Sequence, residues 1–404
     1  MLSQFQVIIT ADVMMNFRIP ILLYFGYCLY SPSFFKQLPY IVLYAIVGKI
    51  INIAMSTLLT KFSLELLLKF EITYSQTIIF CCVSNIVEPL NAFTFFKETS
   101  ANNFFLLLGA FIIGNATAFD VFNAFVKIAH LPKHVDVPEL TYFCLALKPV
   151  WDGVFGSLIG AVVGIFVATI IRLNDKERVG ENYEIGLIVA SSCFVYFLSS
   201  FLRLSTMFAV LSCCLVQERY LFTNLSVNSV LAVKTILGAM SYCIELLFYI
   251  FIGYKFMSVD FKQVYQYALI ALVASYLTKS IMIIVTSLII NLWKKSKIKT
   301  QMQGLLIFGG IRGARSYPLL VGYLGPFSRT FQDMLLIIIV FSVLVDGIIS
   351  NVLVIVLRRW LYNPSVEDRE IHMVPWVMER KTNSCVEWLR KKELILYNLF
   401  KVED

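Results

Sequence analysis

The chain has 404 residues, of which 59% are hydrophobic and only 15% are charged, and its formal net charge is +8. A soluble domain of this size does not need so much apolar surface, so the composition indicates an integral membrane protein. The positive charge does not indicate nucleic-acid binding, because the lysines lie mostly in loops and at helix ends, and the chain has no basic patch interleaved with aromatic residues.

Apolar segments of about 20 residues, the length that crosses a bilayer as a helix, recur along the chain. We count about eleven, which predicts an all-α polytopic membrane protein with a transmembrane domain over residues 1–361 and a short tail over residues 362–404. The segments are 7–30, 37–60, 74–96, 103–129, 149–172, 184–200, 203–216, 229–254, 264–291, 302–324 and 332–359. The first lacks a basic leader and a small-residue cleavage site, so we expect no cleaved signal peptide.

The segment at 74–96 contains an acidic residue followed by proline, in the run SNIVEPLNAF. Pro89 cannot donate a backbone hydrogen bond, so it breaks the helical ladder and frees carbonyl groups. The carboxylate of Glu88 beside freed carbonyls predicts a set of cation ligands. A simple proline kink is the alternative interpretation.

Residues 304–323, GLLIFGGIRGARSYPLLVGY, hold two arginines, four internal glycines and a proline in an otherwise apolar segment. A guanidinium at mid-membrane costs about 2.5–3.5 kcal/mol on insertion scales, so Arg312 should face a polar cavity or a carboxylate. Unwound backbone at this depth is tolerated only where it is buried in protein or lines a cavity. The alternative is a kinked helix with snorkelling arginines.

Each half of the chain therefore has one interrupted span, at 84–92 and at 308–318. This pairing is typical of inverted-repeat secondary transporters with a binding site at the midplane. Ionisable residues in the apolar segments should pair with one another or line water. They include Lys49, Glu88, Asp120, Asp152, Glu245, Lys279, Arg312, Arg315 and Asp346. Each could be a structural ion pair, and their number is what favours an ion or proton pathway.

Basic clusters at 294–299 and 358–359 lie on the same side of the membrane, since two spans separate them, and they predict a cytoplasmic C-terminus. Leu389, Leu396 and Phe400 recur near helical spacing in the tail, which predicts an amphipathic helix on the membrane surface. A regulatory protein that binds this helix is the alternative. The nine cysteines and three histidines show no metal-ligand spacing, and no nucleotide-binding or nucleophile motif is present, so we expect no cofactor and no enzyme.

Seven stretches carry motifs of one known family, in that family's order. They are RIPILLYFGYCL (18–29, against LPPIILDAGYFL), YIVLYAIVGKIIN (40–52, against the following span), IVEPLNA (86–92, against AVDPVAV), VYFLSSFLRLS (195–205, against AYLSAELFHLS), YLFTNLS (220–226, against YVEANIS), IELLFYIFIG (244–253, against SETLIFIFLG) and GGIRGARS (309–316, against GGLRGAIA). Over roughly residues 17–360 the chain thus resembles the sodium/proton exchangers of the monovalent cation/proton antiporter superfamily.

The resemblance implies an inverted-repeat antiporter fold with two broken helices. It also implies exchange of Na⁺, Li⁺ or K⁺ for H⁺ by a homodimer in which a core domain moves like an elevator. Glu88 and Arg312 would serve on the two broken helices, and Glu245 would be a core glutamate. Lys279 would stand where the family carries a basic residue that pairs with the ion-binding carboxylate or competes for it.

The chain departs from the family at acidic positions. Residues 109–117, GAFIIGNAT, stand in place of GESLLNDAV, so Asn115 replaces the ion-binding aspartate and Ala110 replaces the glutamate. Ser200 and Tyr24 replace two further acidic residues. The first segment resembles a later span of the family, so we expect about two of the family's N-terminal helices to be missing.

An asparagine can ligate a cation through its carbonyl oxygen, but it cannot carry a proton. Asp120 lies five residues beyond Asn115, about 140° round the helix, which makes it a poor substitute. Glu88 is the better substitute because it already lies at a broken helix, and Asp120 and Asn91 are additional candidates.

The leading hypothesis is a monovalent cation/proton antiporter in the plasma membrane or an endomembrane. Glu88 and Asn115 would form the ion site where the broken helices cross, Arg312 and Lys279 would neutralise carboxylates and helix ends, and Glu245 would be a core partner. The alternative is a degenerate member that no longer transports and acts as a scaffold or regulator, which the missing acidic groups favour. A proton-gated channel on the same fold is a third interpretation.

Overall fold

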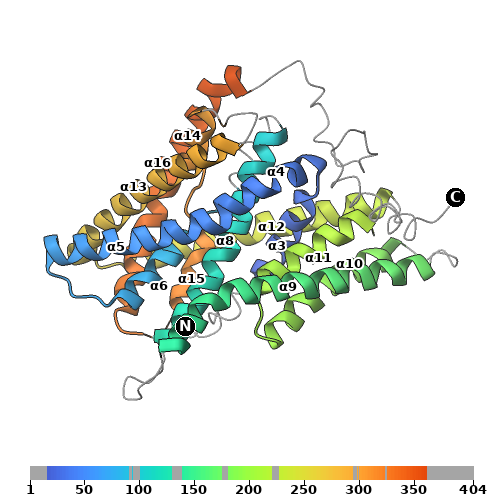
Figure 1. Ribbon diagram of the computed structural model, residues 1–404, viewed down its shortest axis with the longest axis horizontal. Helices are drawn as coiled ribbons and strands as arrows, with labels where there is room; N and C mark the ends of the chain where they lie inside the picture. Colours follow the sequence, from blue (N-terminus) through green and yellow to red (C-terminus); the bar gives the residue numbers. More distant parts are fainter. Residues whose placement is uncertain are drawn as a thin grey trace. The chain divides into compact units, whose positions relative to one another are not determined.

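Helices make up the regular structure in the described part of the chain, apart from one isolated β-bridge. The computed structural model describes residues 16–90, 93, 101–129, 139–174, 181–220, 227–293, 298, 300–323 and 325–361. The chain divides into a first unit (residues 1–18, 33–151 and 242–368) and a second unit (residues 19–32, 152–241 and 369–404). Figure 1 labels the helices, and boundaries between the units fall within α9 (Glu139–Asn174) and α12 (Val227–Phe256).

Seven helices among the described residues are long and apolar enough to cross a bilayer. They are Ser33–Leu68, Asn103–Ala129, Leu147–Ile171, Tyr183–Phe201, Ser229–Phe256, Val264–Leu292 and Ser328–Leu353, and each overlaps a predicted segment. The other four predicted segments hold shorter helices, namely α3 (Arg18–Leu29), α6 (Tyr74–Ser84), α11 (Thr206–Tyr220) and the pair α14 (Thr300–Phe308) and α15 (Tyr317–Val321). The all-helical membrane fold is therefore as predicted, and within the described residues the segments at 74–96 and 302–324 are interrupted at 85–88 and 309–313.

One group of helices in the first unit surrounds the first interruption. Helix α4 (Pro32–Val42), a π-helical segment (Leu43–Gly48) and α5 (Lys49–Leu68) follow one another without a break. Helix α6 begins after a capping box formed by Thr73 and Gln76, and it packs against both α5 and α8 (Ala101–Ala129).

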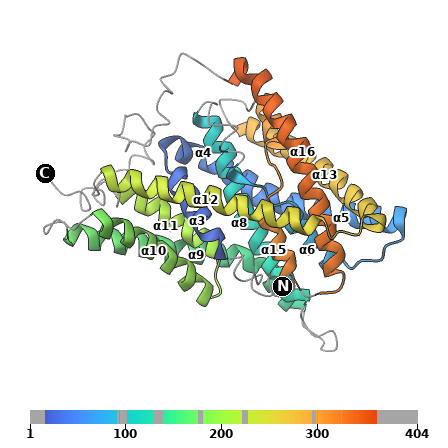
Figure 2. The same cartoon turned by 180° about the vertical axis from the view of Figure 1, so that it is seen from behind.

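A second group in the same unit surrounds the second interruption. It contains α13 (Phe261–Trp293), the broken pair α14 and α15 with a 3₁₀ turn (Ala314–Ser316) between them, and α16 (Ser328–Leu361). Helix α14 packs against both α13 and α16, and α15 packs against α16 and α6. Figure 2 shows α13 and α16 lying alongside each other.

Glycines let two helices of the second unit approach closely. Gly160 and Gly164 of α9 face α11, Gly156 faces Ser205 just before α11, and a Cβ atom at Gly160 would overlap the carbonyl oxygen of Ala209. Glycines spaced four residues apart line one face of a helix and allow backbones to pack against each other in membranes. Helix α11 also packs against α10 (Glu181–Phe201).

A neutral hydrogen-bond network joins three helices of the second unit. The Tyr27 hydroxyl on α3 donates to Oε1 of Gln217 on α11 at 2.6 Å and lies 3.0 Å from Oγ of Ser192 on α10. The Nε2 atom of Gln217 donates to Oγ of Ser191 at 2.9 Å. Near the end of α11, Glu218 pairs with Lys234 of α12 at 2.6 Å.

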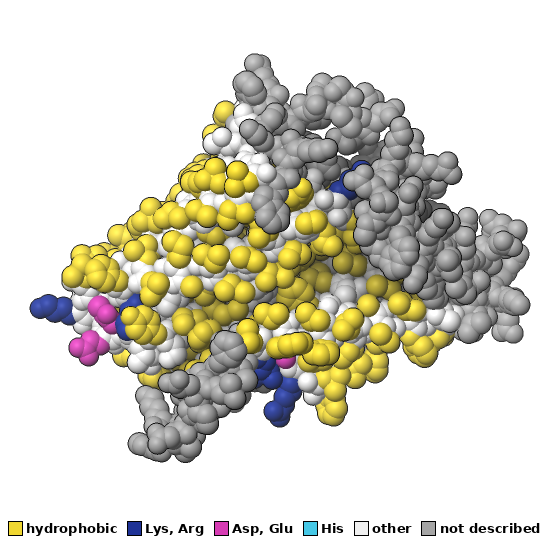
Figure 3. All heavy atoms as spheres, viewed as in Figure 1, with side chains coloured by type: hydrophobic (Ala, Val, Ile, Leu, Met, Phe, Trp, Pro, Cys, Tyr) yellow, Lys and Arg dark blue, Asp and Glu magenta, His cyan; other side chains and the backbone are white. Residues whose placement is uncertain are grey.

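The outward faces of the long helices carry large apolar side chains. Phe62 on α5, Phe166 on α9 and Ile250 on α12 are all well exposed. On the face drawn in Figure 3, hydrophobic side chains cover most of the described surface, and the few charged ones gather near helix ends. Such a surface suits a hydrocarbon environment, while the charged residues discussed below point inward.

Candidate functional site

The two interruptions meet in the first unit. Residues 85–88 follow the end of α6 and residues 309–313 follow the end of α14, and an antiparallel bridge joins Val87 to Arg312. The amide of Glu88 donates to the Ile311 carbonyl at 2.8 Å, and the amide of Gly313 donates to the Ile86 carbonyl at 3.1 Å. Each broken segment thus supplies hydrogen-bond partners to the other, which unwound backbone inside a membrane requires. We call residues 85–88 and 309–313 the crossing.

Asn115 on α8 holds residues 85–88 of the crossing in place. Its Oδ1 accepts a hydrogen bond from the Val87 amide at 2.9 Å, and its Nδ2 donates to the Val87 carbonyl at 2.6 Å. An ionised aspartate could accept the first bond but could not donate the second. The structure therefore places Asn115 at the crossing, with both ends of its amide bonded to backbone.

Cationic side chains lie at the carboxyl ends of both broken helices. These ends carry carbonyl groups without helical partners and a partial negative charge. Lys49 donates to the Asn85 carbonyl at 2.5 Å, and Lys279 donates to the Ile307 carbonyl at 2.6 Å. A Cβ atom at Gly310 would lie 2.8 Å from Nζ of Lys279, so the absence of a side chain there lets the lysine reach this end of α14.

Arg312, which is only 2% exposed, joins both helix groups. Its Nη1 donates to the Ser84 carbonyl, the last of α6, and lies 3.3 Å from Oδ1 of Asn85. Its Nη2 donates to Oγ of Ser275 at 2.8 Å, and the guanidinium lies 5.5 Å from the centre of the Tyr276 ring. Arg312 thus compensates the end of α6 while its own backbone belongs to the second interruption.

A buried carboxylate on α16 supports Arg312 from the other side. The amide of Arg312 donates to Oγ of Ser342 at 2.9 Å, and that hydroxyl donates to Asp346 at 2.6 Å. Tyr276 also donates to Asp346. Asp346 therefore accepts hydrogen bonds from two hydroxyl groups, and one of them also binds the backbone of Arg312.

Glu88 is fully buried, with 0% exposure, and pairs with Arg315. Nε of Arg315 donates to Oε2 of Glu88 at 3.0 Å, and Nη2 contacts Oε1. A Cβ atom at Gly313 would lie 3.1 Å from Oε2, so the glycine makes room for the carboxylate. From the sequence we expect Arg312 and Lys279 to neutralise carboxylates and helix ends. The structure gives the Glu88 pairing to Arg315 and leaves Arg312 and Lys279 at the helix ends.

The sequence presents Arg315 only as one of several charges in apolar segments. The available signal was its position in the same glycine-rich interruption as Arg312, where the resembling family motif has an apolar residue. Glu245 on α12 lies near enough to Glu88 and Arg315 for their charges to interact. Its side chain also bonds to Tyr249, while its Oε2 has no hydrogen-bond partner among the described residues.

The other candidate residues stand apart from these contacts or cannot be placed. Asp120 is buried on α8, beyond Asn115, and does not line the cavity that is described in the next paragraph. Asn91 lies outside the described residues, as do the tail and the 294–297 lysines. In the described ranges, no three His, Cys, Asp or Glu side chains are grouped to hold a metal ion.

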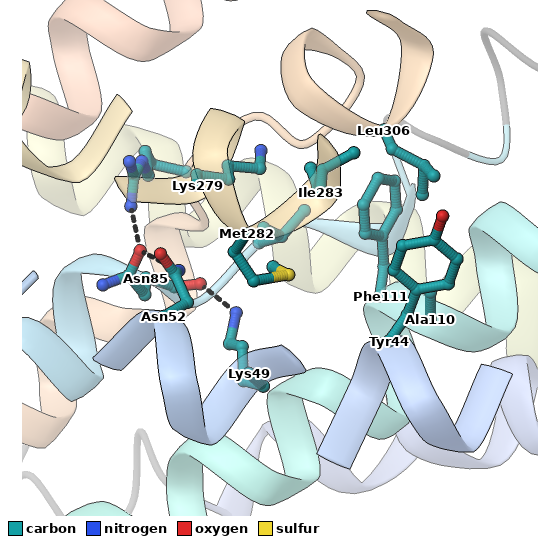
Figure 4. Close-up of a pocket in the computed structure, with 12 residues that line it drawn as sticks. Tyr44, Lys49, Asn52, Asn85, Ala110, Phe111, Lys279, Met282, Ile283 and Leu306 are labelled. Carbon is teal, nitrogen blue, oxygen red and sulfur yellow. Dashed lines mark hydrogen bonds between the residues drawn. The ribbon is translucent and has the colours of Figure 1, made fainter. Parts of the chain in front are cut away.

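A cavity of about 40 Å³ lies beside the crossing. Its polar lining residues are Lys49, Asn52, Asn85, Lys279 and Arg312, and the rest of its wall is mainly aromatic and aliphatic. Figure 4 shows Lys49 directed toward Asn85, with Met282 and Phe111 across the space. Polar groups from both helix groups of the first unit therefore line one small cavity.

Known proteins resemble the chain over most of its length. The family described as "Sodium/hydrogen exchanger, transmembrane" matches residues 3–356. Sodium/hydrogen exchanger 3 of Mus musculus is 25% identical over 365 residues, which cover 87% of this chain and 42% of the relative. The Na(+)/H(+) exchanger beta of Oncorhynchus mykiss is 24% identical over 368 residues, which cover 87% of this chain and 47% of the relative. The chain spans less than half the length of these relatives.

A solved structure shares the fold. The sodium proton antiporter MjNhaP1 from Methanocaldococcus jannaschii, at pH 8, superposes with a TM-score of 0.57 and 16% identity, covering 87% of this chain and 88% of the other. This likeness concerns the fold alone. Because the family match extends over residues 3–356, the chain belongs to the sodium/hydrogen exchanger family.

Proposed function

We propose that this chain exchanges a monovalent cation, Na⁺ in the first place, for protons across a membrane. The observation that carries the proposal is the buried Glu88 carboxylate, which lies at the crossing of two broken helices and is neutralised by Arg315. A carboxylate can bind a proton or a metal cation, and it cannot hold both strongly at once. Competition for one acidic group couples the two fluxes.

In this proposal Arg315 compensates a carboxylate both before and after an ion binds Glu88. While Glu88 is ionised and empty of other cations, Arg315 compensates its charge. When a proton or Na⁺ binds Glu88, the guanidinium loses its partner, and Glu245 offers a second carboxylate close by. With Glu245 ionised, Arg315 keeps a carboxylate partner after Glu88 is occupied, which avoids the high energy of an unpaired cation in this environment.

We propose that access alternates between the two sides through movement of the helices that carry the crossing. One group of helices contains α5, α6 and α8, and the other contains α13, α14–α15 and α16. In each group a broken helix packs against two long helices, as an inverted repeat would arrange them. In this proposal, about eleven segments cross the membrane within residues 1–361, and the 362–404 tail lies on the cytoplasmic side. The working form is a homodimer.

Substitution of Glu88 by glutamine tests the proposal. Purified protein in liposomes should show Na⁺-dependent proton flux, and Glu88→Gln should reduce it at least about tenfold, because an amide takes no proton. Glu65→Gln is the matched control, since Glu65 forms only a partly exposed pair with Lys61 on α5. Size-exclusion profiles would verify folding of both variants. Undiminished flux in folded Glu88→Gln would overturn the proposal.

A second candidate function rests on Asn115 and Arg315. Asn115 bonds to the Val87 backbone at both ends, and Arg315 already occupies the Glu88 carboxylate. An arginine that never leaves would make the chain a non-transporting scaffold or regulator. In that case the unmodified chain would give no flux in liposomes with Na⁺, Li⁺ or K⁺, and the double variant Asn115→Asp with Arg315→Gln should gain it. Flux from the unmodified chain excludes this candidate.

A further inference from the structure

The cavity beside the crossing has a positively charged wall. Lys49 from α5, Lys279 from α13 and Arg312 from the second interruption line it, and among the described residues that line it there is no carboxylate. Lys279 and Arg312 are buried. Three cations line a space of about 40 Å³, and the partial negative charges at the ends of α6 and α14, about half a unit each, compensate them only in part.

The nearby carboxylates do not supply that charge inside the cavity. Glu88 pairs with Arg315. Asp346 accepts hydrogen bonds from Tyr276 and Ser342, and it is not part of the cavity wall. Three cations therefore line the cavity, and the one carboxylate close to Arg312, that of Asp346, lies outside the cavity wall.

The wall also offers more hydrogen-bond donors than acceptors. Each lysine ammonium has three donors, and Lys49 and Lys279 each use one on a backbone carbonyl. The Asn85 carbonyl already accepts from Lys49, and its Oδ1 accepts from Asn52 and Arg312. Oδ1 of Asn52 is an acceptor without a donor among the described residues, and a water molecule beside an anion would satisfy it.

We propose that this cavity binds one small monovalent anion of the halide type, with chloride as the abundant representative. A water molecule needs roughly 10–15 Å³ of such space, so the cavity holds an ion of this size with at most a few waters. Phe111 and Met282 also line the cavity, and their apolar surfaces suit a weakly hydrated anion. The anion joins α5, α13 and the crossing through charge, so it stabilises the fold, and its binding does not depend on transport.

The test compares chloride with gluconate, which is too large for the cavity, at constant Na⁺ concentration and ionic strength. Full-length protein in detergent should unfold at a higher temperature in chloride or bromide, with a saturable dependence on halide concentration. Lys49→Met should weaken halide affinity at least about tenfold. Lys61→Met on the same helix is the control, because Lys61 contacts Glu65 and the Tyr74 ring and does not line the cavity.

Equilibrium dialysis of the unmodified chain with radioactive chloride provides a second measurement that needs no variant. We expect about one chloride per chain, displaced by bromide and not by gluconate. Absence of bound chloride, or a halide effect that does not saturate and persists in Lys49→Met, would overturn the proposal. Neither readout measures flux, so a failed anion site and a failed antiporter are distinguishable.

Discussion

The two units bury polar groups beneath an apolar surface, and they stabilise these groups in different ways. The first unit buries charges and unwound backbone, with Arg312, Lys49 and Lys279 at helix ends and the Glu88–Arg315 pair beside them. The second unit relies mainly on glycine contacts between α9 and α11 and on the neutral network around Gln217, and it has one ion pair, Glu218–Lys234, near the end of α11. Buried charge can be redistributed when an ion binds, whereas close backbone contact resists rearrangement. The difference predicts that changes in the second unit affect stability, and changes in the first affect both stability and ion movement.

The largest expected loss of stability follows Gly160→Leu in the second unit. Even a Cβ atom there would lie 1.9 Å from the Ala209 carbonyl oxygen and 2.3 Å from Oγ of Ser212, so α9 and α11 must separate. We expect destabilisation of about 3 kcal/mol or more and little folded protein. Thermal unfolding in detergent would measure it.

Gly186→Leu is the matched control for that change. A Cβ atom at Gly186, on α10 of the same unit, has no neighbour within 4 Å. Leucine favours a helix over glycine by roughly 0.5–1 kcal/mol, so this variant should be neutral or slightly more stable. If the two glycine variants unfolded at the same temperature, close helix contact would not be what holds the second unit.

Arg312→Met should have the next largest effect and should lower both stability and flux. It leaves the Ser84 carbonyl and Oδ1 of Asn85 without their cationic donor, and it leaves Asp346 without the nearby positive charge. Loss of a buried charged partner costs about 3–5 kcal/mol. Arg312→Lys should restore only part of it, since an ammonium cannot reproduce the planar fork of donors.

Arg329→Met serves as the control for Arg312→Met, because Arg329 is exposed on α16 in the same unit. Its melting temperature and flux should match those of the unmodified chain. A fully stable and active Arg312→Met protein would show that the charge at the end of α6 is dispensable, and the contrast between the units would then rest on glycine contacts alone.

The sequence predicted the two interruptions because their causes are local. Pro89 cannot donate a backbone bond, and Gly309, Gly310 and Gly313 weaken the helix around Arg312. The inward location of the charges followed from the energy of burying them in lipid. The glycine spacing at 156, 160 and 164 was equally visible in the sequence, but its meaning depends on which helix packs against it.

The pairing of charges could not be predicted, because it depends on backbone direction. In a regular helix Arg312 and Arg315 would lie on one face. The extended residue at 312 and the 3₁₀ turn at 314–316 instead send them to different partners, the end of α6 and Glu88. The bonds of Asn115 to Val87 likewise depend on an approach of α8 that no spacing encodes.

Gln217→Leu in the second unit should have a smaller effect than Arg312→Met. It removes the acceptor of the Tyr27 hydroxyl and the donor to Ser191, although Tyr27 keeps its contact with Ser192. A buried group left without its partner costs about 1–3 kcal/mol. The melting temperature should fall while flux per folded protein stays unchanged. Gln266→Leu, at an exposed position on α13, should change neither, and a specific loss of flux in Gln217→Leu would contradict the division of roles.

Ser342→Ala in the first unit should have the smallest effect, about 1 kcal/mol. It removes the acceptor of the Arg312 amide and one of the two hydroxyl donors of Asp346, while Tyr276 still donates to that carboxylate. Ser350→Ala on the same helix is the comparison, since Ser350 donates only to the Phe308 carbonyl at the end of α14. Buried amides without partners are rarer than carbonyls without partners, so Ser342→Ala should lower the melting temperature more. The reverse order would mean that the hydrogen bond to the end of α14 contributes more to stability than the hydrogen bond to the Arg312 amide.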